Sequence, residues 1–195
     1  MQYRINPGDS RAPGGRVPAP PELAPVQDFV NAHFDEELQV RERPPQPMAA
    51  WFARHDLLPR NARWTPADRE HVLQFRRAVR ELLEANDHDG APPPHAVAVL
   101  NRLARDAALR VEFDATGGAD LRPTASGVER PLGALLAMIF RSMLDGTWQR
   151  LKICRADDCR WAYYDRSKNG SGAWCSMLDC GNRAKARAYR ERRRS

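Results

Sequence analysis

All four cysteines of this 195-residue chain lie within one C-terminal segment, and this arrangement restricts the fold more than any other feature. They form two pairs, each with four residues between its members, and 15 residues separate the pairs: Cys154, Cys159, Cys175 and Cys180. Two local cysteine pairs joined by a loop can bring four sulfur ligands together around one tetrahedral zinc ion. Two disulfides or four free buried thiols are the alternatives, and a cytoplasmic setting disfavours the disulfides.

A zinc ion held by four thiolates has no open position for water, so the sequence predicts one structural Zn²⁺ and no hydrolytic chemistry there. The segment between the pairs has few aliphatic residues, and we expect it to need the metal in order to fold. Five large side chains are expected to form a small core around the site: Trp161, Tyr163, Tyr164, Trp174 and Met177.

The positive charge of the chain is concentrated beside these cysteines. Residues 150 to 195 contain 13 Lys or Arg and 5 Asp or Glu, a net charge of +8, while the whole chain carries +6. The first 149 residues are therefore slightly acidic. A local excess of positive charge attracts polyanions, and inside a cell nucleic acid is the expected one. The alternative interpretation of this charge is a solvated arginine-rich tail without a partner.

The last residues, GNRAKARAYRERRR, contain no proline and favour a helix. Four arginines follow at steps of 4, 3 and 4 and would lie along one stripe of that helix: Arg183, Arg187, Arg190 and Arg194. Such a stripe could bind the phosphates of a nucleic-acid duplex. Near the helix start, Asn182, Arg183 or Lys185 could reach base edges in the major groove.

The rest of the chain is predicted to be mainly helical. After a flexible leader at residues 1–21, which is rich in Pro, Gly and Arg, short helices are expected from Glu22 and around Trp51, with a proline-rich loop between them. Thr65, Pro66 and Asp68 predict the N-cap of a long helix, and Val97, Leu100, Leu103 and Ala107 predict another.

The residues RVEFDA and DLRPTA predict a hairpin around Thr116–Ala119, and Pro123 confines the second strand to an edge. The next helix is the most apolar in the chain and is expected at the centre of the bundle. Its apolar residues are Leu132, Leu135, Leu136, Ile139, Phe140, Met143 and Leu144. The five histidines are scattered, and we interpret them as surface or local structural residues: His33, His55, His71, His88 and His95.

The run CRADDCRWAYYDRSKNGSGAWCSM and the quartet Cys180-Gly181-Asn182-Arg183 resemble the CGNR zinc finger over residues 150 to 192. In the family it resembles, this module is the C-terminal domain of bacterial proteins described as "putative stress-induced transcription regulators". The N-terminal domain of these proteins is called ABATE. The resemblance implies that the four cysteines bind zinc and that the basic C-terminal helix binds DNA. It also implies that residues 22–148 form a sensing or regulatory ABATE-like domain and residues 149–195 the finger with its basic helix.

The leading hypothesis is therefore a zinc-dependent, DNA-binding transcriptional regulator that is not an enzyme. An RNA-binding protein is the second interpretation, because a basic zinc module does not distinguish the two polymers. The third is an enzyme or sensor with a small-molecule pocket in the helical body and a purely structural zinc. Dimerisation through the body and a small-molecule effector are further hypotheses. With no apolar run long enough for a membrane span or a secretory signal, we expect a cytoplasmic, nucleoid-associated protein.

Overall fold

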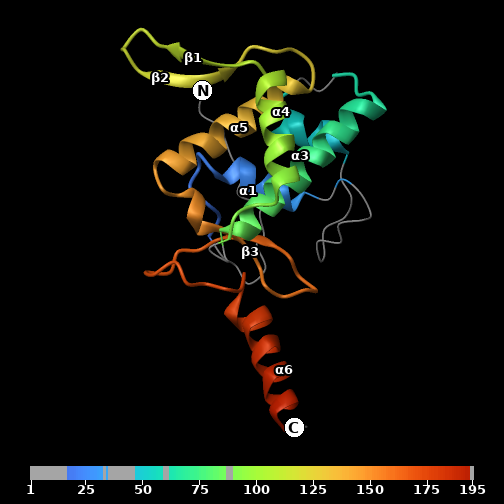
Figure 1. The fold of residues 1–195 in the computed structure, drawn as a ribbon, viewed down its shortest axis with the longest axis vertical. Coiled ribbons are helices and arrows are strands. Elements are labelled where there is room, and N and C mark those ends of the chain that lie inside the picture. The colour runs from blue at the N-terminus through green and yellow to red at the C-terminus, as the bar shows by residue number, and fades with distance from the viewer. Residues whose placement is uncertain (1–16, 33, 35–46, 59–61, 87–89, 194–195) are drawn as a thin grey trace.

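A helical body carries a small cysteine-containing module at one end, and a single helix projects from that module (Figure 1). The computed structural model describes residues 17–32, 34, 47–58, 62–86 and 90–193. The body contains five α-helices: α1 (Ala24–Asn31), α2 (Met48–Arg54), α3 (Pro66–Ala85), α4 (Pro94–Asp106) and α5 (Glu129–Leu144). It also contains the hairpin strands β1 (Leu109–Phe113) and β2 (Ala119–Pro123).

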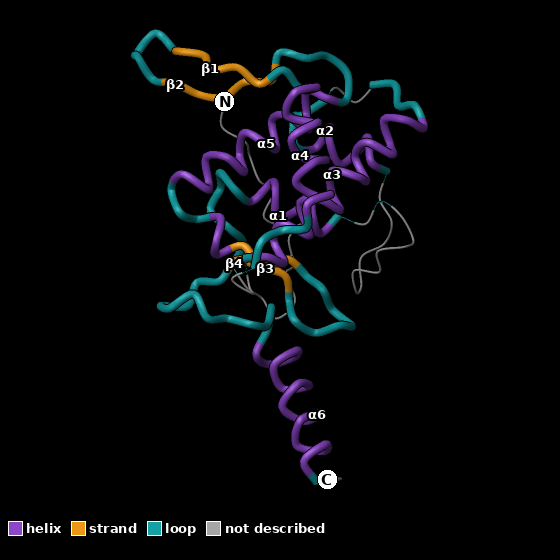
Figure 2. Tube along the Cα trace, viewed as in Figure 1, coloured by secondary structure: helices purple, strands orange, loops and turns teal. Residues whose placement is uncertain are grey.

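The module begins after a short 3-10 helix, η2 (Trp148–Arg150), and all of its elements except the last helix are short (Figure 2). They are strands β3 (Leu151–Ile153) and β4 (Ala162–Tyr164), the π-helical turn η3 (Met177–Gly181) and helix α6 (Asn182–Arg192). The predicted class, mainly helical with a small hairpin and a C-terminal four-cysteine module, is confirmed. None of the helices within the described ranges is long and apolar enough to cross a membrane.

Helix α3 begins at the capping signal that the sequence contains. The Thr65 side chain accepts a hydrogen bond from the Asp68 backbone N–H at 3.1 Å, and the Asp68 carboxylate accepts one from the Thr65 N–H at 2.8 Å. These two bonds satisfy backbone donors that a helix start otherwise exposes. The predicted N-cap is confirmed, and it defines where α3 begins.

The centre of the body is α1, and not α5 as the apolar pattern predicted. Phe29 of α1 is fully buried, with ring centroids 5.2 Å from Trp51 and 5.5 Å from Phe75. On α5, Leu132 and Leu135 are buried, but three of the residues assigned to the bundle centre are exposed: Phe140 (45%), Met143 (39%) and Leu144 (73%). The apolar pattern of α5 is wider than the one face that the body covers, so its outer edge faces solvent.

The hairpin packs on α5 through small residues. In the antiparallel register Leu109 pairs with Pro123 and Phe113 with Ala119, so the proline lies at the end of an edge strand, as predicted. A Cβ atom on Gly133 of α5 would lie 2.6 Å from the Ala107 Cβ and 2.7 Å from the Pro123 Cβ. Glycine is therefore needed at position 133, because any side chain would push the hairpin off the helix.

The module is built into the body through β3 and β4, which contact α3 and α1 respectively. Leu151, Ile153, Ala162 and Tyr164 of these strands belong to the main hydrophobic core. The buried Asn31 side chain donates to the Ala162 carbonyl and accepts from the Ala162 N–H, both at 2.8 Å. The base of the cysteine module is thus held rigidly against the first helix.

A buried arginine makes a second connection between the two parts. Arg80 of α3 donates to the Val30 carbonyl at 2.8 Å and to the Arg160 carbonyl at 2.5 Å. Burial, followed by the nearby charge of Arg160, lowers the pKa of Arg80 to about 10. Glu84, one turn further along α3, forms an ion pair with the Arg160 side chain. One end of α3 therefore binds Arg160, the residue that directly follows Cys159.

Replacing Asn31 with alanine should destabilise the protein by about 1 to 3 kcal/mol, because the Ala162 N–H would lose its buried partner, while the Ala162 carbonyl would keep only the Gln27 side chain. Urea unfolding followed by far-UV circular dichroism measures this change. Asn101→Ala, on the exposed face of α4, is the matched control and should change the free energy of unfolding by less than about 0.5 kcal/mol. Equal stabilities for the two variants would contradict the assigned role of Asn31.

The described part of the expected leader, residues 17–21, lies against the body. Ala19 is buried, and its N–H donates to the Gln27 side chain at 2.7 Å. Residues 1–16 lie outside the described residues, as does most of the proline-rich loop expected between α1 and α2.

Candidate metal centre and basic helix

The two cysteine pairs are positioned by different local structures. Cys154 directly follows β3, and its N–H donates to the Trp161 carbonyl at 2.8 Å, which extends the β3–β4 ladder by one residue. The turn between Cys154 and Cys159 is closed by hydrogen bonds from the Cys159 and Arg160 N–H groups to the Ala156 carbonyl, and Arg160, whose φ of 52° is in the left-handed region, directs the chain into β4. Cys175 precedes η3 and Cys180 lies inside it, so the π-helical turn carries the second pair to the first.

The four sulfur atoms form a compact buried cluster. All lie within 4.8 Å of one another, with Sγ–Sγ distances of 3.5 Å between Cys159 and Cys175 and 3.7 Å between Cys175 and Cys180. A tetrahedral zinc site with Zn–S bonds of about 2.3 Å requires sulfurs about 3.8 Å apart, whereas a disulfide requires about 2.05 Å. The cysteines are unpaired, so the disulfide alternative is wrong, and the donor set has the size and chemistry of a zinc site.

Without a cation, the four buried sulfurs cannot all lose their protons. The pKa of Cys154 is lowered because Cys159 and Cys175 donate hydrogen bonds to its sulfur, while those bonds raise the pKa values of the two donors. Burial, followed by the negative charge of Cys154, raises the pKa of Cys180 to about 12. Four buried thiolates can therefore coexist only when a divalent cation replaces the protons.

A tightly bonded loop, residues 165–174, joins the two pairs. Asp165 is almost fully buried, and its carboxylate accepts from the Ser167 N–H at 3.0 Å and the Gly172 N–H at 2.7 Å. The Lys152 ammonium lies 3.5 Å away and, after those hydrogen bonds, helps to keep the pKa of Asp165 low despite its burial. The Tyr163 hydroxyl donates to the Gly172 carbonyl at 2.5 Å. Sequence reasoning missed this role of Asp165, although an Asp two residues before a Ser is typical of an Asx turn.

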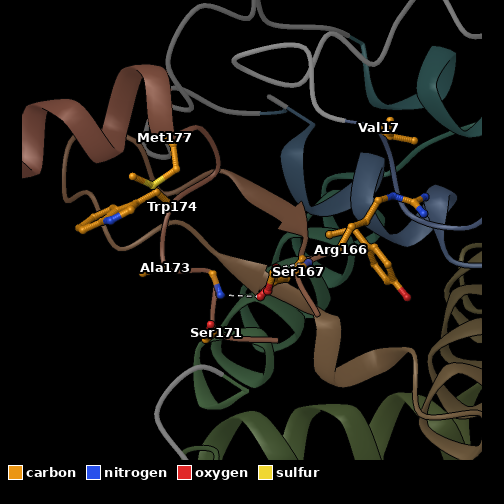
Figure 3. Close-up of a pocket in the computed structure, with 10 residues that line it drawn as sticks. Val17, Arg166, Ser167, Ser171, Ala173, Trp174 and Met177 are labelled. Carbon is orange, nitrogen blue, oxygen red and sulfur yellow. Dashed lines mark hydrogen bonds between the residues drawn. The ribbon is translucent and has the colours of Figure 1, made fainter. Parts of the chain in front are cut away.

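The aromatic residues do not all surround the cysteines as predicted. Trp161, Tyr163 and Trp174 pack against the sulfur cluster. Tyr164, by contrast, belongs to the main core of the body, because alternate residues of β4 face opposite sides of the strand. Met177 is 47% exposed and, with Trp174, lines one side of a surface cavity of about 380 Å³ whose other side carries Arg166 and Val17 (Figure 3).

Arg183 is engaged inside the module. Its guanidinium donates to the Cys180 sulfur at 3.2 Å and lies 3.4 Å from the Asp158 carboxylate and 3.2 Å from that of Asp179. Only 30% of the side chain is exposed. The sequence placed Arg183 among the nucleic-acid contacts, but the structure places its charge between a metal ligand and two acids.

Replacing Arg183 with alanine should weaken zinc binding by about 10- to 100-fold, because a group bonded to a ligand tunes the ligand and fixes its orientation. Competition with a chromophoric chelator measures the zinc dissociation constant. Arg187→Ala removes the same group one turn further along the helix, away from the sulfurs, and should leave zinc affinity unchanged. If both variants bind zinc like the parent, Arg183 has no part in the metal site.

Four of the other predicted nucleic-acid residues lie on α6, which has no buried residue. Asn182, Lys185, Arg187 and Arg190 are exposed, whereas Arg194 lies outside the described residues. The Asn182 amide donates to the Leu178 carbonyl at 3.1 Å, and the Arg190 Nε donates to the Ala186 carbonyl at 3.2 Å. The predicted stripe therefore includes one arginine bound in the module and two that face solvent.

The histidines have structural surroundings where they are described. His55 lies 2.9 Å from the Asp28 carboxylate and stacks on Trp51, and His95 lies 2.8 Å from Glu81. His71 lies 3.6 Å from Glu129, while His33 and His88 are outside the described residues. In the part of the chain that the structure describes, the four cysteines are the only group of three or more residues that could hold a metal ion.

The cysteine spacing, the buried sulfur cluster and the helical body agree with what comparison with known proteins finds. Residues 150–193 match the CGNR zinc finger, which covers the metal centre and α6. Residues 11–146, well over half of the chain, match ABATE, a family described as "putative stress-induced transcription regulator". No curated protein matches the chain. On these matches, the chain belongs to the ABATE family and carries a C-terminal CGNR zinc finger.

Proposed function

We propose that the protein is a transcription regulator in which a structural zinc ion fixes α6 for binding to duplex DNA. The observation that carries this proposal is the helix itself. Its 11 residues include five basic and one acidic side chain, none is buried, and the helix projects away from the body (Figure 1). An isolated helix of this length is only marginally stable in water, and the repulsion among its charges weakens it further. A polyanion along the helix would remove that repulsion.

The zinc ion in this proposal has a purely structural role. Cys154, Cys159, Cys175 and Cys180 would hold it, and their four sulfurs leave no coordination position for a substrate. When bound, the ion supplies a rigid crosslink between β3–β4 and η3. Since η3 continues directly into α6, this crosslink sets the direction of the helix relative to the body.

The body has a regulatory role and no catalytic one in this proposal. Strands β3 and β4 of the module connect the hydrophobic core of the body directly to the metal centre, so a change in α1 or α3 would reach the finger. Dimerisation or a small-molecule effector would act through this connection. The description of the family supports a regulator over the RNA-binding and enzymatic interpretations.

A competition experiment tests the choice of polymer. The zinc-loaded full chain is bound to a fluorescent duplex DNA, and unlabelled duplex DNA or an RNA hairpin of equal charge is added as competitor. We expect the DNA to compete at least ten-fold better, because the deep, narrow major groove of A-form RNA does not admit a helix. Better competition by the RNA would overturn the proposal in favour of an RNA-binding protein.

A further inference from the structure

The surface of α6 divides into faces of different chemistry. Successive helix residues are rotated by about 100°, so residues three or four apart lie on the same face. Leu178, Asn182, Ala186, Tyr189 and Arg193 follow at steps of 4, 4, 3 and 4 and form one stripe, called here the central stripe. The hydrogen bond from the Asn182 amide to the Leu178 carbonyl joins η3 to α6 along this stripe.

Basic residues lie on both sides of the central stripe. Arg190 lies roughly 70° from the stripe on one side, with Arg187 further round at roughly 130°, and Lys185 and Arg192 lie roughly 70° to 90° away on the other side. All four are exposed. The one acidic residue of the helix, Glu191, lies on the opposite face. The central stripe therefore faces a polyanion whenever both basic flanks contact it, while Glu191 points away.

This arrangement fits the major groove of B-form DNA. The groove is about 12 Å wide and has a row of phosphates along each edge, so a helix lying in it needs cations on two flanks and a narrow middle. Ala186 at the middle of the stripe is small enough to let the backbone approach the base edges.

Two residues at the start of the stripe have side chains suited to reading bases. Leu178 is 83% exposed, which is unusual for a leucine and leaves it free to contact a thymine methyl group. The Asn182 amide has two N–H donors and one carbonyl acceptor, and the Leu178 carbonyl accepts from only one of the donors. The second donor and the acceptor match N7 and N6 of adenine, and the existing bond already holds the amide in place.

We infer that Leu178 and Asn182 read a step containing adenine and thymine in the major groove, with Ala186 allowing close approach and the two basic flanks binding phosphates. This inference rests on the proposed function and adds the reading residues and the base type. It reassigns Lys185 and Arg183, which the sequence placed near base edges, to a phosphate flank and to the metal centre respectively.

The test is selection from a randomised duplex library by the zinc-loaded full chain, followed by sequencing. The parent should enrich one motif that contains adenine and thymine. Asn182→Ala should lose a preference of roughly 5- to 150-fold at the adenine position, and Leu178→Ala should lose a smaller preference at the thymine. Lys185→Ala, the matched control on the flank, should keep the motif and bind every sequence more weakly. Zinc content and circular dichroism establish that each variant is folded.

A second arm uses one chemical change in the DNA. Replacing the selected thymine by deoxyuridine removes only the C5 methyl group, so it should weaken the parent several-fold and leave Leu178→Ala unaffected. The inference is overturned if Asn182→Ala and Leu178→Ala enrich the same motif as the parent, or if the parent binds DNA without enriching any motif. Absence of binding to every duplex would overturn the proposed function as well.

Discussion

Replacing Cys175 with serine is expected to abolish both stoichiometric zinc and measurable DNA binding. Serine keeps the size of the side chain but provides no thiolate, so the buried cluster loses one of its four ligands. In zinc-finger peptides the apparent free energy of zinc binding is about 10 to 16 kcal/mol at neutral pH, and it largely replaces a hydrophobic core. The small core around the sulfurs, formed mainly by Trp161, Tyr163 and Trp174, cannot supply that amount alone.

Mass spectrometry under native conditions measures the zinc content, and hydrogen exchange locates the structural loss. Backbone amides of residues 154–181 should lose protection in Cys175→Ser, while the inner face of α3 should keep it, because its capping and packing do not involve the metal. Ser171→Ala, in the exposed loop between the cysteine pairs, is the control and should keep one zinc ion. A Cys175→Ser protein that still binds one zinc ion per chain would refute the four-cysteine site.

Removing Arg187 and Arg190 together should weaken DNA binding by roughly 50-fold at about 0.1 M salt and flatten its salt dependence. Both side chains are exposed on one flank of α6, and each is assigned one phosphate contact. Because each contact releases about 0.9 counterions, the slope of the logarithm of the binding constant against the logarithm of salt should change by about 2. Zinc affinity should stay the same, since neither arginine lies near the sulfurs.

The matched control removes the same charge from the body. Arg102→Ala/Arg105→Ala alters two exposed arginines of α4, at the far side of the body from α6 (Figure 1). Fluorescence anisotropy of a labelled duplex over a range of salt gives both slopes. Equal slopes for the two double variants would mean that the protein binds DNA through its net charge and not through α6.

Several features could be predicted from the sequence because their signals are local. Thr65, Pro66 and Asp68 lie next to each other and identify the start of α3. The cysteine spacing identifies the metal cluster for a similar reason, because each pair is closed by a short turn or by η3. The hairpin followed from two short strands and a glycine-containing turn.

The features that the sequence did not indicate depend on residues far apart in the chain. Asn31 and Ala162 are 131 residues apart, so no periodicity predicts that the finger is bonded to the first helix. The exposure of Phe140 and Leu144 depends on how far the body extends over α5, which an apolar pattern does not specify. Arg183 appeared equivalent to its neighbours on a helical projection, but only Arg183 reaches Cys180.

The most direct test of the account is the salt dependence of duplex DNA binding by the full chain, measured with zinc and after its removal by a chelator. We expect the zinc-loaded protein to bind more weakly as salt rises, with a slope of several units on logarithmic axes, and the zinc-free protein to lose this binding. A zinc-loaded protein that does not bind duplex DNA at low salt, or a zinc-free protein that binds equally well, would contradict it.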